Sequence, residues 1–314
     1  MRRYLVAGGA GFIGSHLVKR LVAENGSVTV IDNLSTGNRS NLESVSDKIK
    51  FIESDITDLQ EHDDFDAIFH LACVANPSDY VRRPLEILKS GSFGTDNLLK
   101  VAEKTGARFY YFSSSEVYGH HKPEDGIFSE STTTNIEILH DRSPYCVSKI
   151  FSEEYVKSYS EMNGVNYLIV RPFNIYGTNM DSKSEYGRVI HNFVNRAVWS
   201  EPLIVNGDGS QIRSFCHVSD IVDAMMLLDE QQDLKQRIVN VGNPEPISIL
   251  DLAKLTIALA KSKSSIEFGE KVDHEPYFRC PNISTIEKWL SWHPRIDLKT
   301  GILALIDFER EKNL

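Results

Sequence analysis

One pattern recurs along most of this chain: a short apolar run rich in β-branched residues is followed by a longer amphipathic segment. The apolar runs are YLVAGG from Tyr4, SVTVID from Ser27, KIKFIESD from Lys48, AIFHLAC from Ala67, RFYYFSS from Arg108, NYLIVRPF from Asn166 and IVNVGN from Ile238. Helices are expected from about Ser15, over about Pro84 to Lys104, over about Pro144 to Met162, and from about Ser219. This alternation predicts an α/β fold with a doubly wound parallel sheet and helices on both faces.

The alternation becomes irregular after Tyr176, which predicts a second, smaller part of the chain. We expect residues 1–176, with residues 214–243 returning to it, to form the parallel-sheet domain. Residues 177–213 and 244–314 would form a smaller C-terminal α/β cap that binds the substrate. Open α/β sheets bind ligands at the carboxyl ends of their strands, so we expect the site there.

Charge and cysteine usage narrow the functional classes. The net charge of -10 is spread along the 314 residues, which argues against nucleic-acid binding because phosphate backbones need a concentrated basic face. The four cysteines have no CxxC spacing and are interpreted as reduced thiols of a cytoplasmic protein. No apolar run reaches the ~18 residues of a membrane span, no signal peptide is recognised, and no histidine or cysteine has metal-ligand spacing.

A glycine motif joins the first strand to the first helix. Gly8, Gly11 and Gly14 form GxxGxxG, and the helix opens at Phe12 and Ile13. Glycines there allow a tight turn, so that a dinucleotide pyrophosphate can approach backbone N–H groups at the positive end of the helix. The sequence therefore predicts a Rossmann-type dinucleotide site.

Asp32 ends the second strand, 18 residues after Gly14. A carboxylate at this position accepts hydrogen bonds from the adenosine ribose and repels a 2′-phosphate, which favours NAD over NADP. Arg39 is close enough in sequence to bind such a phosphate, although a solvated loop arginine is the simpler interpretation.

Tyr145 and Lys149 lie four residues apart on a predicted helix, so their side chains share one face. An ammonium beside a phenol favours the phenolate and would lower the pKa of the tyrosine from ~10. Lys149 could also hold the nicotinamide ribose. A Tyr-x-x-x-Lys spacing is common on solvated helix faces, but here it follows the serine-rich strand end Ser113 to Gly119.

These motifs together resemble the extended short-chain dehydrogenase/reductase family, and the resemblance covers nearly the whole chain. The matching segments are GGAGFIGSHL at Gly8 to Leu17, DNLSTG at Asp32 to Gly37, Asp55-Ile56, HLA at His70 to Ala72, and RPFNIYG at Arg171 to Gly177. The resemblance implies that Asn33 lies at the cofactor, that Asp55 and Ile56 flank the adenine, and that Leu71 and Ala72 pass beside the pyrophosphate and nicotinamide ribose. It also implies NAD as cofactor, a nucleotide sugar as substrate, and a homodimer through the helices near 84–104 and 145–162.

In this family the tyrosine removes a proton from a sugar hydroxyl while a hydride passes to NAD, and a serine or threonine shares the hydrogen bond. Ser114 is the first choice for that serine, Ser115 the second, and Ser113 is interpreted as a backbone cap. Glu116 beside them would handle protons at the sugar C5, whereas a surface glutamate is the structural alternative.

Three further segments resemble UDP-glucuronate decarboxylases. They are ANPSDYVRRPL at Ala75 to Leu85, GRVIHNF at Gly187 to Phe193 with EPLIVNGDGSQIRSF at Glu201 to Phe215, and FRCPNIST at Phe278 to Thr285. The resemblance implies substrate contacts by Tyr80, Asn174, Arg188, Val205, Arg213 and Arg279, with Arg213 and Arg279 near the diphosphate and Arg279 also near the sugar carboxylate. A core-facing loop tyrosine and surface ion pairs are the alternatives for these side chains.

Two segments depart from that pattern. Tyr145-Cys-Val-Ser-Lys149 has the general epimerase/dehydratase form, and the insert from His120 to Asp141 lacks the usual decarboxylase residues. UDP-glucuronate decarboxylation is therefore the leading prediction, with a UDP-sugar 4-epimerase or a nucleotide-sugar dehydratase as alternatives. A non-enzymatic NAD-sensing protein is the remote one.

Overall fold

The structure is a computed structural model that describes residues 1–59, 63–119, 121, 127–180, 189–231, 237–271 and 277–312. The chain divides into two compact units. Unit 1 comprises Met1–Val117, Glu137–Arg171 and Gln231–Val239, and unit 2 comprises Tyr118–Ile136, Pro172–Glu230 and Asn240–Leu314.

A seven-stranded sheet forms the centre of the fold, in the order β11-β6-β5-β4-β1-β2-β3. The strands are β1 (Arg3–Ala7), β2 (Ser27–Asp32), β3 (Ile49–Glu53), β4 (Ala67–His70), β5 (Arg108–Phe112), β6 (Tyr167–Pro172) and β11 (Ile238–Val241). The pairs from β3 through β6 are parallel. All seven apolar runs are thus strands of one sheet, and the predicted doubly wound α/β class is confirmed.

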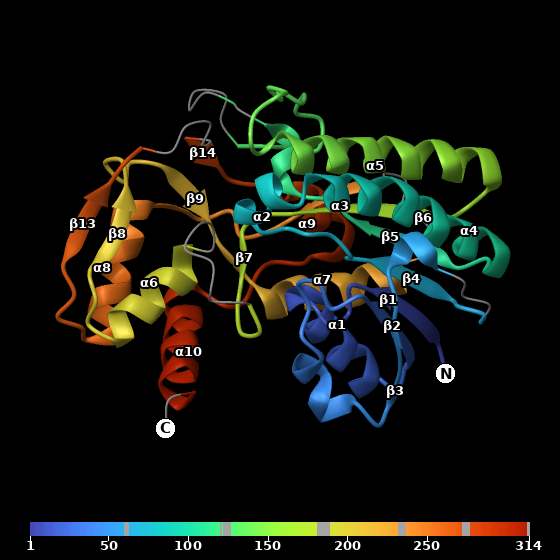
Figure 1. Cartoon of the computed structure of the whole chain (residues 1–314), viewed down its shortest axis with the longest axis horizontal. Coiled ribbons are helices and arrows are strands. Elements are labelled where there is room, and N and C mark those ends of the chain that lie inside the picture. Colours follow the sequence, from blue (N-terminus) through green and yellow to red (C-terminus); the bar gives the residue numbers. More distant parts are fainter. Residues whose placement is uncertain are drawn as a thin grey trace. The chain divides into compact units, whose positions relative to one another are not determined.

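Helices cover both faces of this sheet within unit 1. Helix α1 (Phe12–Ala23) lies on one face, and α3 (Pro84–Lys89), α4 (Thr95–Thr105) and α5 (Ser143–Asn163) lie on the other (Figure 1). The core between the sheet and α4 and α5 is formed by strand residues such as Leu5, Ile68 and Phe109 together with Leu98 and Val156. Helix α2 (Pro77–Arg82) was not predicted.

The long helix expected from Pro84 to Lys104 is interrupted by a π-helical turn, η3 (Ser90–Gly94). Its glycines allow close packing: a Cβ on Gly91 would lie 2.1 Å from the Ser148 Oγ of α5, and one on Gly94 would lie 2.4 Å from Ile56 Cδ1. The Ser90 hydroxyl donates to the Ala72 carbonyl at 2.9 Å. This turn therefore ties the loop after β4 to the middle of α5.

The strand order reverses between β1 and β4, because the chain runs β1-β2-β3 in one direction and β4-β5-β6 in the other. Such a switch point separates the loops that follow the two central strands and leaves a crevice at their carboxyl ends. The glycine turn follows β1 and the Leu71–Ala72 segment follows β4, so both lie at this position.

Unit 2 has its own apolar core, formed mainly by α6 (Val189–Val198), α8 (Ile249–Ala260) and α10 (Leu298–Glu311). Its strands form small sheets: β12-β9-β14, β13-β8 and β10-β7. Their bounds are β7 (Ile175–Tyr176), β8 (Leu203–Asn206), β9 (Ile212–Ser214), β10 (Cys216–His217), β12 (Pro246–Ser248), β13 (Ile266–Gly269) and β14 (Phe278–Arg279). The remaining helices are α7 (Val218–Glu230), as expected from about Ser219, and α9 (Ser284–Leu290). Among the helices of the described ranges, none combines the length and apolarity required to cross a membrane.

Candidate active site

The glycine turn after β1 packs directly against the segment after β4. Gly8 has a φ of +81°, and a Cβ there would lie 2.6 Å from the Ala72 backbone nitrogen. A Cβ on Gly14 would lie 2.1 Å from the Gly8 carbonyl oxygen. The backbone of Leu71 is held by a 2.9 Å hydrogen bond from its N–H to the Ala7 carbonyl. Only glycine fits these positions, and the predicted cofactor residues Gly8, Gly14, Leu71 and Ala72 are brought together.

The start of α1 is suited to an anion. Gly11 is the N-cap residue and offers no side-chain cap, and the first turn contains no acidic residue. Its early N–H groups, from Phe12 and Ile13 onward, cannot bond within the helix, and the helix dipole makes this end positive. The turn therefore fits a dinucleotide pyrophosphate, as the glycine spacing predicts.

Asp32, at the end of β2, binds the glycine turn through hydrogen bonds. One carboxylate oxygen accepts the Ala10 N–H and the other the Leu34 N–H, both at 2.9 Å. Burial raises the pKa of Asp32, and these two backbone hydrogen bonds partly offset the rise. Arg39, the residue that could have favoured NADP, lies with its guanidinium 4.7 Å from the ring centre of Phe51. Asp32 thus carries the negative potential that disfavours a 2′-phosphate.

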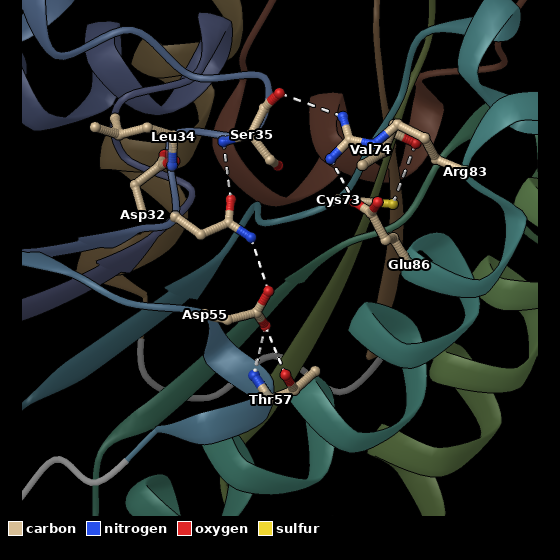
Figure 2. A network of polar contacts seen from close by, with 10 residues as sticks. Asp32, Leu34, Ser35, Asp55, Thr57, Cys73, Val74, Arg83 and Glu86 are labelled. Carbon is tan, nitrogen blue, oxygen red and sulfur yellow. Dashed lines mark hydrogen bonds and ion pairs between the residues drawn. The ribbon is translucent and has the colours of Figure 1, made fainter.

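A polar network continues from Asp32 to the end of β3 (Figure 2). Asn33 donates to Asp55 at 2.7 Å, and Asp55 accepts the N–H and hydroxyl of Thr57, each at 2.8 Å. Burial alone would raise the pKa of Asp55, but these hydrogen bonds outweigh it and lower the pKa. Ile56, between Asp55 and Thr57, is buried at 4% exposure against η3.

The same view includes Arg83, at the junction of α2 and α3. Its guanidinium donates to the Ser35 carbonyl at 3.2 Å and pairs with Glu86 (Figure 2). The loop that follows Asp32 is therefore linked to the helices that follow β4.

Tyr145 and Lys149 lie on one face of α5, as predicted, and both are buried. The Lys149 ammonium donates to the Phe112 carbonyl at 2.7 Å and lies 4.9 Å from the ring centre of Tyr111 and 5.7 Å from that of Tyr145. Burial raises the pKa of Tyr145 and lowers that of Lys149. The pKa of Tyr145 is therefore raised in this structure and not lowered as the spacing suggested, because desolvation of the phenol dominates.

The serines after β5 take distinct roles. The Ser114 hydroxyl accepts the Glu116 N–H at 3.1 Å, and its hydrogen bond with Tyr145 opposes the rise in the pKa of that phenol. Ser115 is buried in the 3-10 turn η4 (Ser115–Tyr118). Ser113, interpreted as a backbone cap, instead donates its hydroxyl to Glu153. The interpretation of Ser113 as a backbone cap is therefore wrong. Glu153, two turns after Tyr145 on α5, lies within hydrogen-bonding distance of Ser113 at the end of β5.

Glu116 lies close to Tyr145 and is paired with an arginine that none of the sequence motifs contains. Arg142 Nη2 lies 2.9 Å from Glu116 Oε1. Arg142 comes three residues before Tyr145, a helical spacing that could have indicated it.

Tyr80, predicted to contact the sugar, stacks on Tyr145 with ring centres 4.7 Å apart and planes at 8°. Its hydroxyl donates to the Ala75 carbonyl at 3.3 Å, and the residue is only 3% exposed. Burial raises the pKa of Tyr80 well above its usual range. Its position is that of a support for the ring of Tyr145.

In unit 2, two of the predicted substrate arginines are adjacent. Arg213 of β9 and Arg279 of β14 are register partners on adjacent parallel strands, and they are 8% and 2% exposed. Arg213 donates to the Ile212 and Tyr277 carbonyls, and Arg279 donates to the Gly119 carbonyl at 3.2 Å. Guanidinium groups suit phosphate and carboxylate groups, which they can bind through two parallel hydrogen bonds. The pair therefore has the chemistry of an anion site.

The other substrate predictions in unit 2 have different outcomes. Asn174 adopts a left-handed φ of +38° and donates its amide to the Ser214 carbonyl at 2.9 Å, which places it beside β9. Val205 is 0% exposed in the apolar core, so its burial argues against a substrate contact. Arg188 lies outside the described residues.

A dinucleotide turn at the sheet's switch point, followed by a Ser–Tyr–Lys set at the end of β5, defines an enzyme of the short-chain dehydrogenase/reductase type. The chain belongs to the NAD dependent epimerase/dehydratase family, whose sequence model matches residues 4–242. It is thus an NAD-dependent enzyme.

Similarities to individual proteins support this family assignment. The chain is 36% identical over 319 residues to UDP-glucuronic acid decarboxylase 1 of Arabidopsis thaliana, covering 99% of this chain and 71% of that protein. It is similar to the solved structure of UDP-glucose 4-epimerase from Thermotoga maritima, with a TM-score of 0.89, 27% identity and coverage of 99% and 100%. It is also similar to the solved structure of a UDP-glucuronic acid 4-epimerase mutant from Bacillus cereus, with a TM-score of 0.89, 25% identity and 99% coverage of both chains. That mutant was solved with UDP-4-deoxy-4-fluoro-glucuronic acid and NAD.

Proposed function

We propose that this protein is a UDP-glucuronate decarboxylase that works through a 4-keto sugar. The observation that carries the proposal is the carboxylate of Glu116, which lies close enough to Tyr145 for its charge to raise the pKa of the phenol, while the Glu116 backbone N–H donates to Ser114. The similarity over 99% of the chain to a UDP-glucuronic acid decarboxylase supports the same reaction.

The first step is oxidation of the sugar at C4. The residues after β1 and β2 serve the cofactor, and those after β5 act on the sugar hydroxyl. NAD, when bound, supplies the acceptor for the C4 hydride, returns that hydride at the end, and brings a positively charged nicotinamide ring. The glycine turn and the start of α1 would hold its pyrophosphate, and Asp32 would hold its ribose. Tyr145 takes the proton of the C4 hydroxyl, and Ser114 shares that hydrogen bond. Burial disfavours the phenolate, and the positive charges of Lys149 and, when NAD is bound, of the nicotinamide ring would offset this cost.

Oxidation at C4 places a ketone β to the C6 carboxylate. The bond between C5 and C6 then breaks, CO₂ leaves, and its electron pair forms an enolate whose oxygen lies at Tyr145 and Ser114. These two hydroxyl groups stabilise the developing oxyanion. Glu116 orders a water molecule that delivers a proton to C5. The C4 ketone is then reduced by the hydride removed in the first step, and Tyr145 returns its proton to the C4 oxygen, which gives UDP-xylose.

The anionic parts of the substrate need positive partners. We propose that Arg213 and Arg279 bind the diphosphate and that Arg279 also recognises the sugar carboxylate, because guanidinium groups match both anions and the two side chains are adjacent. In this proposal residues 177–213 and 244–314 form the substrate-binding part and the parallel-sheet domain carries the cofactor.

The test is the mass of the product. Wild-type protein incubated with UDP-glucuronate and NAD should release CO₂. The mass of the product should be lower than that of UDP-glucuronate by the mass of CO₂. An unchanged mass with inversion at C4 would establish a 4-epimerase, which the Tyr145-Cys-Val-Ser-Lys149 segment also allows. Loss of water from a neutral nucleotide hexose would establish a dehydratase. Binding of NAD without turnover of any nucleotide sugar would support the NAD-sensing alternative.

Tyr145→Phe tests the proton-transfer step within this proposal. We expect turnover to fall by ~10²-fold or more, since the phenol moves the proton, while substrate affinity is largely kept. Lys149→Ala should weaken both catalysis and NAD binding. Retention of most activity in Tyr145→Phe would exclude Tyr145 as the base.

We further propose a cytoplasmic homodimer. Leu85, Phe93, Val147 and Phe151 expose apolar side chains on α3, η3 and α5, with 68%, 63%, 38% and 46% exposure. Such a grouping on neighbouring helices is typical of an interface. All four cysteines are free thiols, as expected in a reducing compartment. Phe151→Asp should convert a dimer to a monomer in light scattering, and a wild-type monomer would contradict the proposal.

A further inference from the structure

Both oxygens of the Glu116 carboxylate face groups from the beginning of α5. Arg142 Nη2 lies 2.9 Å from Oε1, and the Cys146 thiol lies 4.0 Å from Oε2. Arg142 is the N-cap residue of the helix, and its N–H donates to His140 Nδ1 at 3.2 Å. The guanidinium is therefore attached to a defined point of the backbone and does not extend from a free loop.

This ion pair differs from the surface pairs of the same protein. The side chains of Arg142 and Glu116 are 17% and 19% exposed, whereas those of Arg20 and Glu24, paired at 3.0 Å on α1, are 42% and 57% exposed. Water screens the Arg20–Glu24 pair, so its two charges influence each other little. Burial strengthens the interaction of the Arg142–Glu116 pair and makes an unpaired Glu116 carboxylate costly.

The Arg142–Glu116 pair is connected to Tyr145 through both the backbone and the carboxylate of Glu116. The Glu116 backbone N–H donates to the Ser114 hydroxyl, which also bonds Tyr145. The charge of Glu116 contributes to the raised pKa of Tyr145, and those of Glu116 and Arg142 act in opposite directions on Tyr80. The described groups around Glu116 thus include Arg142 at the N-cap of α5, Tyr145 and Cys146 of α5, and Tyr80 of α2.

We propose that Arg142 is a positioning residue for the sugar chemistry: it holds Glu116 beside Tyr145 and keeps it as a carboxylate. In this form Glu116 accepts the hydrogen of a sugar hydroxyl or of a water molecule and does not itself give up a proton. The inference rests on the proposed function, and it deepens that function by defining how Glu116 takes part.

The first test needs no substrate. Protein labelled with ¹³C at the glutamate carboxyl groups is titrated by NMR, and the Glu116 resonance is assigned by its loss in Glu116→Gln. We expect Glu116 to protonate at a pH higher by about one unit or more in Arg142→Gln than in wild type, because the opposite charge is gone. Arg20→Gln, which breaks the exposed pair, serves as the matched control and should leave this titration unchanged. An unchanged midpoint in Arg142→Gln would overturn the proposal.

The second test is a double-mutant cycle on turnover of the nucleotide sugar that the wild type converts. Arg142→Gln should lower kcat by roughly tenfold, or about 1.4 kcal/mol, and move the acid limb of its pH profile upward, because Glu116 loses the opposite charge that holds it as a carboxylate. In the Glu116→Gln background the same substitution should change kcat by less than about twofold. Equal losses in both backgrounds, or superimposable pH profiles, would show that Arg142 has only a structural role.

Arg142→Lys covers the case in which Arg142→Gln does not fold. It keeps the charge but loses the planar fork, so we expect a smaller shift of the acid limb that again disappears in Glu116→Gln. If wild-type protein fails to decarboxylate UDP-glucuronate, the proposed reaction falls while the NMR titration still decides the role of Arg142.

Discussion

The substitution Glu153→Gln tests the buried network behind the catalytic residues. Glu153 accepts hydrogen bonds from Arg171 Nε at 2.8 Å, from Arg171 Nη2, and from the Ser113 hydroxyl. The Glu153 and Arg171 side chains are each 10% exposed. Breaking a buried pair leaves one charge without its partner and costs ~3–5 kcal/mol, and we expect about 3 because the glutamine carbonyl still accepts one bond.

Glu154 is the matched control for this substitution. It is the next residue of α5, and its side chain is 68% exposed. Its Oε1 atom lies 3.4 Å from Lys157 Nζ. An exposed pair of this kind contributes ~0–1 kcal/mol, so Glu154→Gln should stay within about 0.5 kcal/mol of wild type. Ser113→Ala, which removes one hydrogen bond and keeps the ion pair, should be intermediate at about 1 kcal/mol.

The assay is urea unfolding at pH 7, followed by circular dichroism. With a slope of about 3 kcal/mol/M, the loss in Glu153→Gln lowers the midpoint by roughly 1 M. Because Ser113 precedes Ser114 and Glu153 lies one turn after Lys149, turnover should fall together with stability. Equal midpoints for Glu153→Gln and Glu154→Gln would refute the reasoning that the buried pair stabilises this region.

Three further predictions concern the cofactor, the stacked tyrosines and pH. Asp32→Ala should narrow the preference for NAD over NADP in calorimetric titrations, since the repelling carboxylate is lost, and equal binding of both by wild type would contradict this. Tyr80→Phe should keep kcat and KM within about threefold, whereas Tyr80→Leu should lower kcat by up to tenfold because stacking contributes ~0.5–1.5 kcal/mol. A large rise in KM for Tyr80→Phe would instead support the sugar contact predicted from sequence. Burial and the charge of Lys149 lower the pKa of His70 from 6.5 to about 3, so between these values the unfolded chain binds a proton that the folded protein does not. Stability should therefore fall by ~1.4 kcal/mol per pH unit below pH 6.5, and His70→Asn should remove this part of the pH dependence of the unfolding midpoint.

Patterns within short stretches of the chain predict the sheet and the cofactor turn. Seven apolar runs became the seven strands, and the glycines between the first strand and helix became the turn at the switch point. Tyr145 and Lys149 were predictable because helical periodicity alone places residues four apart on one face. Each of these features is encoded by neighbours along the chain, where backbone geometry leaves few alternatives.

Contacts between distant parts of the chain hold these residues in place, and short-range patterns do not predict them. Glu116 and Arg142 are 26 residues apart, Ser113 and Glu153 are 40 apart, and Tyr80 reaches Tyr145 from a different helix. No local period encodes such pairs, because they depend on where the end of β5 meets the start of α5. The pKa of Tyr145 was misjudged for the same reason: spacing places an ammonium nearby, but only packing determines how much water the phenol loses.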